Sequence, residues 1–378
     1  MIASFWTPKH VASIAAAPIP AAPVIAAGDR YGTVPGFDHW DYWPVQNPDG
    51  SVADIANGTL WMVLAAPASG DPIDRHLHAR IRLLHEKSGQ WTDLGFVLPA
   101  GLNPGNREWS GSAILTDAHH VTLFYTAAGL TGTSGGWQQR LFQTQATLTF
   151  ADELPQLTGW SPPIESVKSD GQHYVIVDQL DGKPGTVKAF RDPAYFCDPA
   201  DGASYLLFAA SLAQSSSSHN GCVGWARSSS EAHTQWDLLA PLVVADSLNN
   251  ELERPHLLFK NDLYYLFWST QNSVFAPDGP AGPTGLYGMV AETISGPYTP
   301  LNGSGLVIAN PASEPRQAYS WQVLNDLRVT SFTDYPKAGL QILSSDDART
   351  YFGGSLAPMI KIVLDGATAT LASGPEQA

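Results

Sequence analysis

The sequence predicts an all-β protein, and two observations support this prediction. Short runs rich in β-branched and aromatic residues recur along the chain, and clusters of Gly, Pro, Asn, Asp and Ser separate them. Helical periodicity is scarce, whereas 34 Gly and 29 Pro provide for many turns. Many short strands over 378 residues indicate a sandwich, a barrel or a propeller, and periodicity alone does not choose among them.

The expected strands follow one another closely through most of the chain. They are predicted at residues 59–67, 78–86, 112–117, 121–129, 140–150, 204–212, 222–229, 263–270, 285–293, 328–335, 350–366 and 368–373. The Ser-rich run at 215–221 is predicted to be a loop between two strands. No convincing internal repeat and no dividing linker is found, so we expect a single domain over residues 1–378.

The charge balance limits the kinds of partner. A net charge of −15 argues against nucleic acid and anionic membrane surfaces, since both require a basic face. A neutral substrate suits such a protein, and the charge serves solubility. The 12 Trp and 13 Tyr can stack on sugar rings, but filling a β-sheet core is the first interpretation of most of them.

Targeting and cysteine signals are weak. No apolar run approaches the roughly 20 residues that span a bilayer. Prolines interrupt the apolar segment 11–27 and no basic region precedes it, so no cleavable signal peptide is predicted. Cys197 and Cys222 cannot build a disulfide framework, and one bridge or two buried thiols both remain open.

Three acids occur in settings that suit the cleavage of a sugar bond. Asp41 lies in "DHWDYWPVQ", Asp192 in "AFRDPAYF" and Glu253 in "NELERPHLLF". Two carboxylates across a cleft can break a glycosidic bond, one as nucleophile or base and the other as proton donor. Glu251 and Glu253 would share one face of a strand, whereas Arg254 would point away unless the backbone bends. Each motif also has a plainer interpretation. Asp41 could lie at a packed strand end, Asp192 could belong to a turn, and Glu251 with Glu253 could belong to a charged surface segment.

Other chemical motifs are poorly supported. "WSGSA" lacks the second glycine of a nucleophile elbow, and no helix follows it, which argues against a serine hydrolase. His76 and His78 would share one strand face and could hold a metal, but no third ligand is in view, so no metal site is predicted. "GPAGPTG" is not a dinucleotide loop, because prolines occupy it and no βα unit surrounds it. No cofactor is therefore expected.

Taken in order, "WDYWP", "EWSGSA", "FRDP" and "ELERPH" resemble glycoside hydrolase family 68, the levansucrases, inulosucrases and related β-fructofuranosidases. The resemblance extends to "FWTPKHVASI", "DRHLHARIRLL", "GPTGLYGMVAETISGPYTPLNGSGLVIANP" and "QAYS". The resemblance covers nearly the whole chain, with the motifs in the same order as in the family. It is strongest to the family's Gram-negative members.

The resemblance implies a five-bladed β-propeller with a central funnel-shaped active site and a wrapping N-terminal segment, residues 1–36. It implies Asp41 as the nucleophile that forms a covalent fructosyl-enzyme, Glu253 as general acid/base and Asp192 as stabiliser of the oxocarbenium-like transition state. The implied substrate-binding residues line the fructosyl pocket, bind sucrose or hold Glu253: Trp40, Trp109, Ser110, Arg191, Glu251, Arg254 and Tyr319.

Departures from the family pattern concern the acceptor side. Gln271 stands where many relatives have His or Arg, at a position associated with acceptor binding, which puts long-polymer synthesis in doubt. Trp321 replaces the His of the "YSH" pattern, so a remodelled acceptor side is expected. Asn250 replaces an Asp that serves a calcium site in Gram-positive members, so no calcium is predicted there.

The expected protein is a retaining, sucrose-acting fructosyltransferase and β-fructofuranosidase whose partners are sucrose and sugar acceptors. An extracellular or periplasmic location and a monomer are expected, with a cytoplasmic location and a dimer left open. Two alternatives remain: an inverting five-bladed glycosidase acting on arabinan or xylan, and a non-catalytic carbohydrate-binding propeller.

Overall fold

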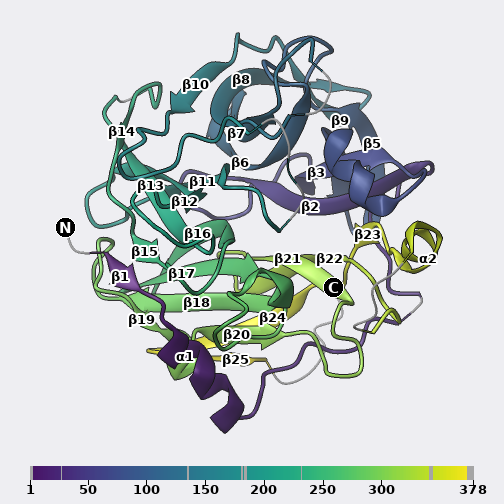
Figure 1. Ribbon diagram of the computed structural model, residues 1–378. Coiled ribbons are helices and arrows are strands. Elements are labelled where there is room, and N and C mark those ends of the chain that lie inside the picture. The colour runs from purple at the N-terminus through teal and green to yellow at the C-terminus, as the bar shows by residue number, and fades with distance from the viewer. Residues whose placement is uncertain are drawn as a thin grey trace.

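The computed structural model describes residues 3–26, 28–133, 136–179, 182, 185–230, 232–339 and 344–372. Its strands form four sheets that are arranged around a common centre (Figure 1). The prediction of an all-β protein is confirmed. None of the helices within these ranges is long and apolar enough to cross a membrane.

The largest sheet has nine strands in the order β10-β8-β7-β6-β2-β3-β4-β5, with β9 beside β8. Two antiparallel units meet in this sheet, because β2 and β6 pair in parallel only through Val45 with Ala113 and Gln46 with Ile114. Its strands are β2 (Phe37–Gln46), β3 (Thr59–Pro67), β4 (Arg80–Lys87), β5 (Gln90–Phe96), β6 (Arg107–Asp117), β7 (His120–Ala128), β8 (Gln139–Ala151), β9 (Leu154–Thr158) and β10 (Ile164–Val167).

The three smaller sheets complete the circle. The six-stranded sheet contains β1 (Ser4–Phe5), β11 (Phe190–Cys197), β12 (Ser204–Ser211), β13 (Gly221–Ser228), β14 (Trp236–Leu238) and β15 (Val243–Val244). One five-stranded sheet contains β16 (Glu253–Lys260), β17 (Leu263–Thr270), β18 (Gly285–Ala291), β19 (Thr299–Pro300) and β20 (Leu306–Ala309). The other contains β21 (Ala318–Val323), β22 (Arg328–Thr333), β23 (Ser355–Leu356), β24 (Ile360–Asp365) and β25 (Thr368–Leu371).

Helical segments are short, as the scarcity of helical periodicity predicts. They are α1 (Pro8–Ala12), α2 (Ser345–Tyr351) and the 3₁₀ turns η1 (Ser13–Ala16), η2 (Pro72–Leu77), η3 (Asn272–Val274) and η4 (Leu301–Gly303). The Ser-rich run at 215–221 is a loop up to Gly221, where β13 begins. Cys197 and Cys222 are both free thiols, which removes the disulfide alternative.

The N-terminal segment lies against three of the sheets. β1 pairs in parallel with β15, Ala21 bridges to Ala309, and Tyr31 bridges to Leu356. Trp6 is buried in a core cluster that contains residues of the six-stranded sheet and of the sheet formed by β16 to β20. Its indole N–H donates to the Ser304 carbonyl at 2.9 Å. The segment therefore packs across sheet boundaries rather than within one sheet.

Polar contacts near the start of β2 join the nine-stranded sheet to the segment around α2 and β23 at the end of the chain. Asp38 accepts a hydrogen bond from Arg349 of α2 at 2.8 Å, and the His39 amide donates to the Gly354 carbonyl at 3.0 Å. Together with the pairing of β2 and β6, these contacts attach β2 on both sides. The strand that carries the "WDYWP" segment is thus a fixed part of the circle.

Replacing Trp6 with Ala tests the packing of the N-terminal segment. Trp6 is 1% exposed and makes edge contacts with Trp268 and Phe275, with ring centroids at 5.3 and 5.6 Å. We expect Trp6→Ala to lower the free energy of unfolding by about 3–5 kcal/mol, because a large core side chain leaves a cavity. The matched control is Phe5→Ala, which removes a side chain that is 57% exposed. Equal shifts of the denaturation midpoint in both variants would contradict this account of Trp6.

Candidate active site

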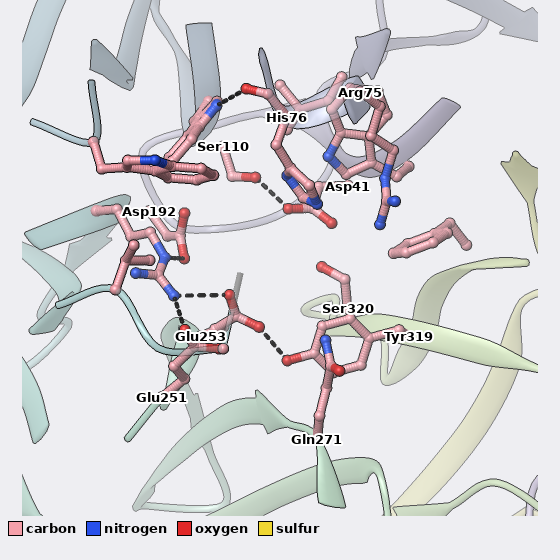
Figure 2. Close-up of a pocket in the computed structure, with 18 residues that line it drawn as sticks. Asp41, Arg75, His76, Ser110, Asp192, Glu251, Glu253, Gln271, Tyr319 and Ser320 are labelled. Carbon is pink, nitrogen blue, oxygen red and sulfur yellow. Dashed lines mark hydrogen bonds and ion pairs between the residues drawn. The ribbon is translucent and has the colours of Figure 1, made fainter. Parts of the chain in front are cut away.

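One pocket at the centre of the circle contains most of the residues that the sequence singled out. It encloses about 700 Å³ of space, open mouth included, which is within the usual range for small-molecule sites. Its lining comprises Trp40, Asp41, Leu64, Arg75, His76, Trp109, Ser110, Trp137, Gly185, Val187, Arg191, Asp192, Glu251, Glu253, Gln271, Tyr319, Ser320 and Phe332. Figure 2 shows Asp41 and Glu253 on opposite sides of the open space.

The pocket is built on β-bulges in five strands that surround the centre. β2, β6, β11, β16 and β21 each shift register against the next strand at the pocket. A bulge bends a strand and redirects its side chains. Consecutive residues of four strands therefore line the pocket, although a regular strand would alternate its faces: Trp40 with Asp41, Trp109 with Ser110, Arg191 with Asp192, and Tyr319 with Ser320.

Backbone conformation at three bulges is uncommon for residues other than glycine. Asp192, Arg254 and Ser320 have φ values of 63°, 49° and 59°. Non-glycine residues in this left-handed region are uncommon and often mark functional sites. At these three positions the strained backbone directs a side chain into the pocket or into its support.

Asp41 is held by a hydroxyl and faced by aromatic rings. Ser110 donates a hydrogen bond to Asp41 Oδ2. The rings of Trp40 and Trp109 each lie edge-on to His76, with centroids 6.0 and 6.4 Å from the imidazole. The indole N–H of Trp109 donates to the His76 carbonyl at 3.1 Å. The carboxylate is thus oriented by one donor and bordered by a largely apolar wall.

Arg191 is the common partner of three carboxylates. Its Nη2 lies 3.0 Å from Glu253 Oε1 and 3.2 Å from Glu251 Oε1, and its Nε lies 3.8 Å from Asp192 Oδ2. Tyr319 donates its hydroxyl to Glu253 Oε2. Among the described residues, the buried Nη1 of Arg191 has no hydrogen-bond partner, so it is available to a ligand.

The same cluster shifts several pKa values. Burial raises the pKa of Glu251 to about 7; the Glu253 carboxylate adds to the shift and Arg191 opposes it. Burial also raises the pKa of Asp192 to about 7, opposed by Arg191 and reinforced by Glu253 and Asp41. Burial disfavours the charged form of Arg191, but the three carboxylates outweigh it and raise the pKa of the guanidinium. The pocket therefore binds protons near neutral pH that free acids would have released.

Arg254 is the one expected substrate-binding residue that does not line the pocket. Its Nη1 donates to the carbonyl and hydroxyl of Ser320 at 3.0 and 3.1 Å. Its Nη2 donates to the Tyr42 carbonyl at 2.8 Å and to Gln322 Oε1 at 2.6 Å. Its backbone amide donates to Asp192 Oδ2 at 3.2 Å. The guanidinium thus joins β2, β16 and β21 behind the pocket.

The sequence did not indicate the part played by η2, which brings Arg75 and His76 to the pocket. The expectation of a strand face shared by His76 and His78 is wrong, because Asp71 caps a 3₁₀ turn and β4 begins only at Arg80. The proline after Asp71 was an available signal, since it favours the first position of a helical turn. Burial, with Arg75 adding to it, lowers the pKa of His76 well below its usual value, so the imidazole is neutral.

Three aromatic or amide positions also have defined places. Gln271 lines the pocket, but Trp321 is 1% exposed and packs edge-on against Tyr319, with ring centroids 6.1 Å apart. Tyr42 is buried against Trp61 in a separate cluster. Trp321 therefore lies behind Tyr319 and outside the pocket lining. Trp137 and Phe332, which no motif indicated, complete the aromatic lining.

Metal-ligand geometry is not found among the described residues, where no group of three or more His, Cys, Asp or Glu is arranged to hold an ion. The absence of a calcium site at Asn250 remains a prediction. Its side chain bonds instead to Lys188, Gly185 and Val187.

Opposed carboxylates, a shared arginine and aromatic walls define a pocket of the glycoside-cleaving class. Comparison with known proteins identifies the family. The family model described as Levansucrase/Invertase matches residues 4–220 and 213–375. A levansucrase of Zymomonas mobilis is 34% identical over 355 residues, covering 86% of this chain and 80% of that protein.

Two further matches agree. An extracellular sucrase of Zymomonas mobilis is 32% identical over 354 residues, covering 86% of this chain and 83% of that protein. The structure of an inulosucrase from Halalkalicoccus jeotgali bound to kestose is 35% identical, with a TM-score of 0.90 over 98% of this chain and 95% of that one. The chain belongs to glycoside hydrolase family 68, which confirms the resemblance seen in its motifs.

Replacing Asp192 with Asn tests the buried acid cluster through protein stability. Because the pKa of Asp192 rises from 3.8 to about 7 on folding, the unfolded chain releases this proton at lower pH than the folded protein. Stability therefore falls as pH rises from about 4 to about 7, and the loss is complete above that range. We expect Asp192→Asn to be more stable than the native protein at pH 8 by roughly 2–4 kcal/mol, and by much less at pH 4.5.

Thermal midpoints at both pH values provide the measurement. Asp278→Asn, at an exposed position, is the matched control and should show no such pH dependence. A stability difference for Asp192→Asn that is the same at pH 4.5 and pH 8 would show that burial does not shift this acid.

Proposed function

We propose that this protein is a retaining, sucrose-acting fructosyltransferase and β-fructofuranosidase. The observation that carries the proposal is the placement of Asp41 and Glu253 on opposite sides of one pocket, each held by a hydroxyl donor. The relatives named levansucrase and extracellular sucrase, and the inulosucrase structure bound to kestose, support sucrose as substrate.

In the first step, Asp41 attacks the fructosyl anomeric carbon while Glu253 donates a proton to the glycosidic oxygen, and glucose leaves. The hydrogen bond from Ser110 fixes the attacking carboxylate. In the second step, Glu253 takes a proton from water or from a sugar hydroxyl, whose oxygen then displaces Asp41. Two displacements at one carbon retain its configuration, as in retaining glycosidases generally. Side chains supply every step, so the proposal includes no cofactor.

Asp192 would stabilise the positive charge that develops on the fructosyl ring in the transition states of the two steps, and Arg191 would bind the substrate. Asp192 would bind fructosyl hydroxyls and, once ionised, favour an oxocarbenium-like transition state. The unpaired Nη1 of Arg191 would donate to a sucrose hydroxyl, while its Nη2 remains with Glu251 and Glu253. Trp40, Trp109 and Ser110 would form the wall of the fructosyl subsite. Arg254 supports this arrangement from behind rather than binding sugar.

The leaving-group side of the pocket would contain Glu251, Tyr319 and Gln271. Gln271 offers an amide but no cation to an acceptor, so we propose that short fructo-oligosaccharides are favoured over long levan. Trp321 is too deeply buried to contact an acceptor and would act by positioning Tyr319.

We propose a single catalytic domain with the architecture of a five-bladed β-propeller. The support is that β2, β6, β11, β16 and β21 each begin an antiparallel unit and each bring a bulge to the pocket. Residues 1–36 would form a segment that wraps around the propeller. We also propose a monomer, and an extracellular or periplasmic location supported by the relative named extracellular sucrase.

Loss of either central acid should abolish turnover. We expect Asp41→Asn and Glu253→Gln each to lower kcat on sucrose by about 10³-fold or more, because each removes the nucleophile or the proton donor without a change in size. Glucose release measured with sucrose as sole substrate checks this. Near-native activity in either variant would contradict the assignment.

Water and sugar compete for the covalent intermediate, so the product ratio should depend on sucrose concentration. We expect glucose to exceed free fructose, and the excess to grow from about 10 mM to about 1 M sucrose as acceptor sugar replaces water. Anion-exchange chromatography of the products gives this ratio, the linkage type and the chain length. Following the anomer released first by NMR distinguishes retention from the inverting alternative, and binding of sucrose without turnover would favour a non-catalytic carbohydrate-binding protein.

A further inference from the structure

Lys188 makes an unusual set of contacts beside the pocket. Its ammonium donates to the Ser218 carbonyl at 2.6 Å, to Asn220 Oδ1 at 2.5 Å and to Asn250 Oδ1 at 3.1 Å. An ammonium has three donors, and here all three meet neutral oxygens. The arrangement is that of a small cation within an oxygen cage, except that the cation is covalently attached to the chain.

The cage joins segments that are far apart in sequence. Lys188 lies two residues before β11, and Ser218 and Asn220 belong to the loop that leads into β13. Asn250 lies in the segment that leads into β16 of a different sheet. Asn220 also bridges directly to Asn249. The ammonium thus connects the six-stranded sheet to its neighbour at the pocket's edge.

Pocket residues directly adjoin these three oxygens. Asn250 immediately precedes Glu251, and its side-chain amide donates to the carbonyls of Gly185 and Val187 at 3.1 and 3.3 Å. Gly185, Val187 and Glu251 all line the pocket. One asparagine therefore binds two lining residues and directly precedes a third, and Lys188 holds that asparagine.

Lys188 itself is firmly anchored and electrostatically linked to the site. Its backbone amide donates to Gln179 Oε1 at 3.0 Å, and its carbonyl accepts from Gln139 at 2.8 Å. Partial burial lowers the pKa of Lys188, while the Glu251 carboxylate opposes that shift. Removal of the ammonium would leave the side-chain oxygens of the buried Asn220 and Asn250 without this donor, which is unfavourable for the native arrangement.

We propose that Lys188 is a positioning residue whose ammonium acts as a tethered cation, holding Asn250 so that Glu251 and the wall at Gly185 and Val187 fit the sugar on the leaving-group side. This inference rests on the proposed function, because it names the part of the substrate that the wall holds. Within the described part of the chain, Asp41 and Glu253 make no hydrogen bond to this cage and keep their own hydroxyl partners.

Lys188→Met retains the stem of the side chain and removes its charge and donors. We expect the KM for sucrose to rise about 5–10-fold with kcat within about 2-fold of the native value, because binding of the leaving group weakens while the two central acids stay in place. Lys87→Met, at an exposed position at the end of β4, is the matched control and should change neither value. A lower melting temperature with an unchanged KM would overturn the proposal, since a purely structural lysine predicts that result.

Chemical rescue separates the ammonium from the stem. In Lys188→Ala, ethylammonium at about 50–200 mM should lower the raised KM for sucrose at least 3-fold. Tetramethylammonium, which has no N–H donor, should leave KM unchanged. Equal effects of the two ions, or none from ethylammonium, would overturn the proposal.

If the Lys188 variants fail to fold, Asn220→Ala provides the decision. It removes one of the three oxygens and should raise KM about 2–3-fold; an unchanged KM would overturn the proposal. Absence of sucrose turnover in the native protein would instead refute the proposed function, so the two failures are distinguishable.

Discussion

The pocket depends on one buried guanidinium. Arg191 lies between Glu251, Glu253 and Asp192, three carboxylates that would otherwise repel one another in a site withdrawn from water. Burying a charge lowers stability unless the charge is paired. Removing one member of a buried ion pair is strongly destabilising, because the other charge is left without compensation. Arg191 makes it physically possible for the protein to place so many acids around one neutral substrate. Its Nη1 has no hydrogen-bond partner among the residues that the structure describes.

Around this ion cluster, the strands must direct enough side chains toward the centre of the molecule. Regular strands alternate their faces, so only every second residue could reach the centre. The bulges in β2, β6, β11 and β21 bring two consecutive residues each into the lining. The cost is strained backbone at Asp192, Arg254 and Ser320, and hydrogen bonds from Arg254 help to hold two of these bulges in place.

The sequence revealed the outer strands more readily than those that build the site. Runs rich in β-branched and aromatic residues, such as 59–67, 121–129 and 263–270, correspond to β3, β7 and β17. β2, β11, β16 and β21 were absent from the expected strands, because their acids, arginines and prolines resemble turns when read by periodicity alone. The motifs on those same strands nevertheless identified six of the pocket's lining residues, since family resemblance preserves chemistry where regular patterning fails. Phe332 lay in no motif and Arg75 lay in one that gave it no role, and only the folded chain places them in the pocket.

Arg254 has a consequence for when the protein can become active during its synthesis. Its guanidinium binds the Tyr42 carbonyl from the first part of the chain and Ser320 and Gln322 from the last part. A nascent chain that has not yet emerged beyond β16 leaves that guanidinium without its later partners, and leaves Glu253 without Tyr319. Catalytic activity should therefore appear in one step, late in synthesis on the ribosome, rather than increase as each sheet is added.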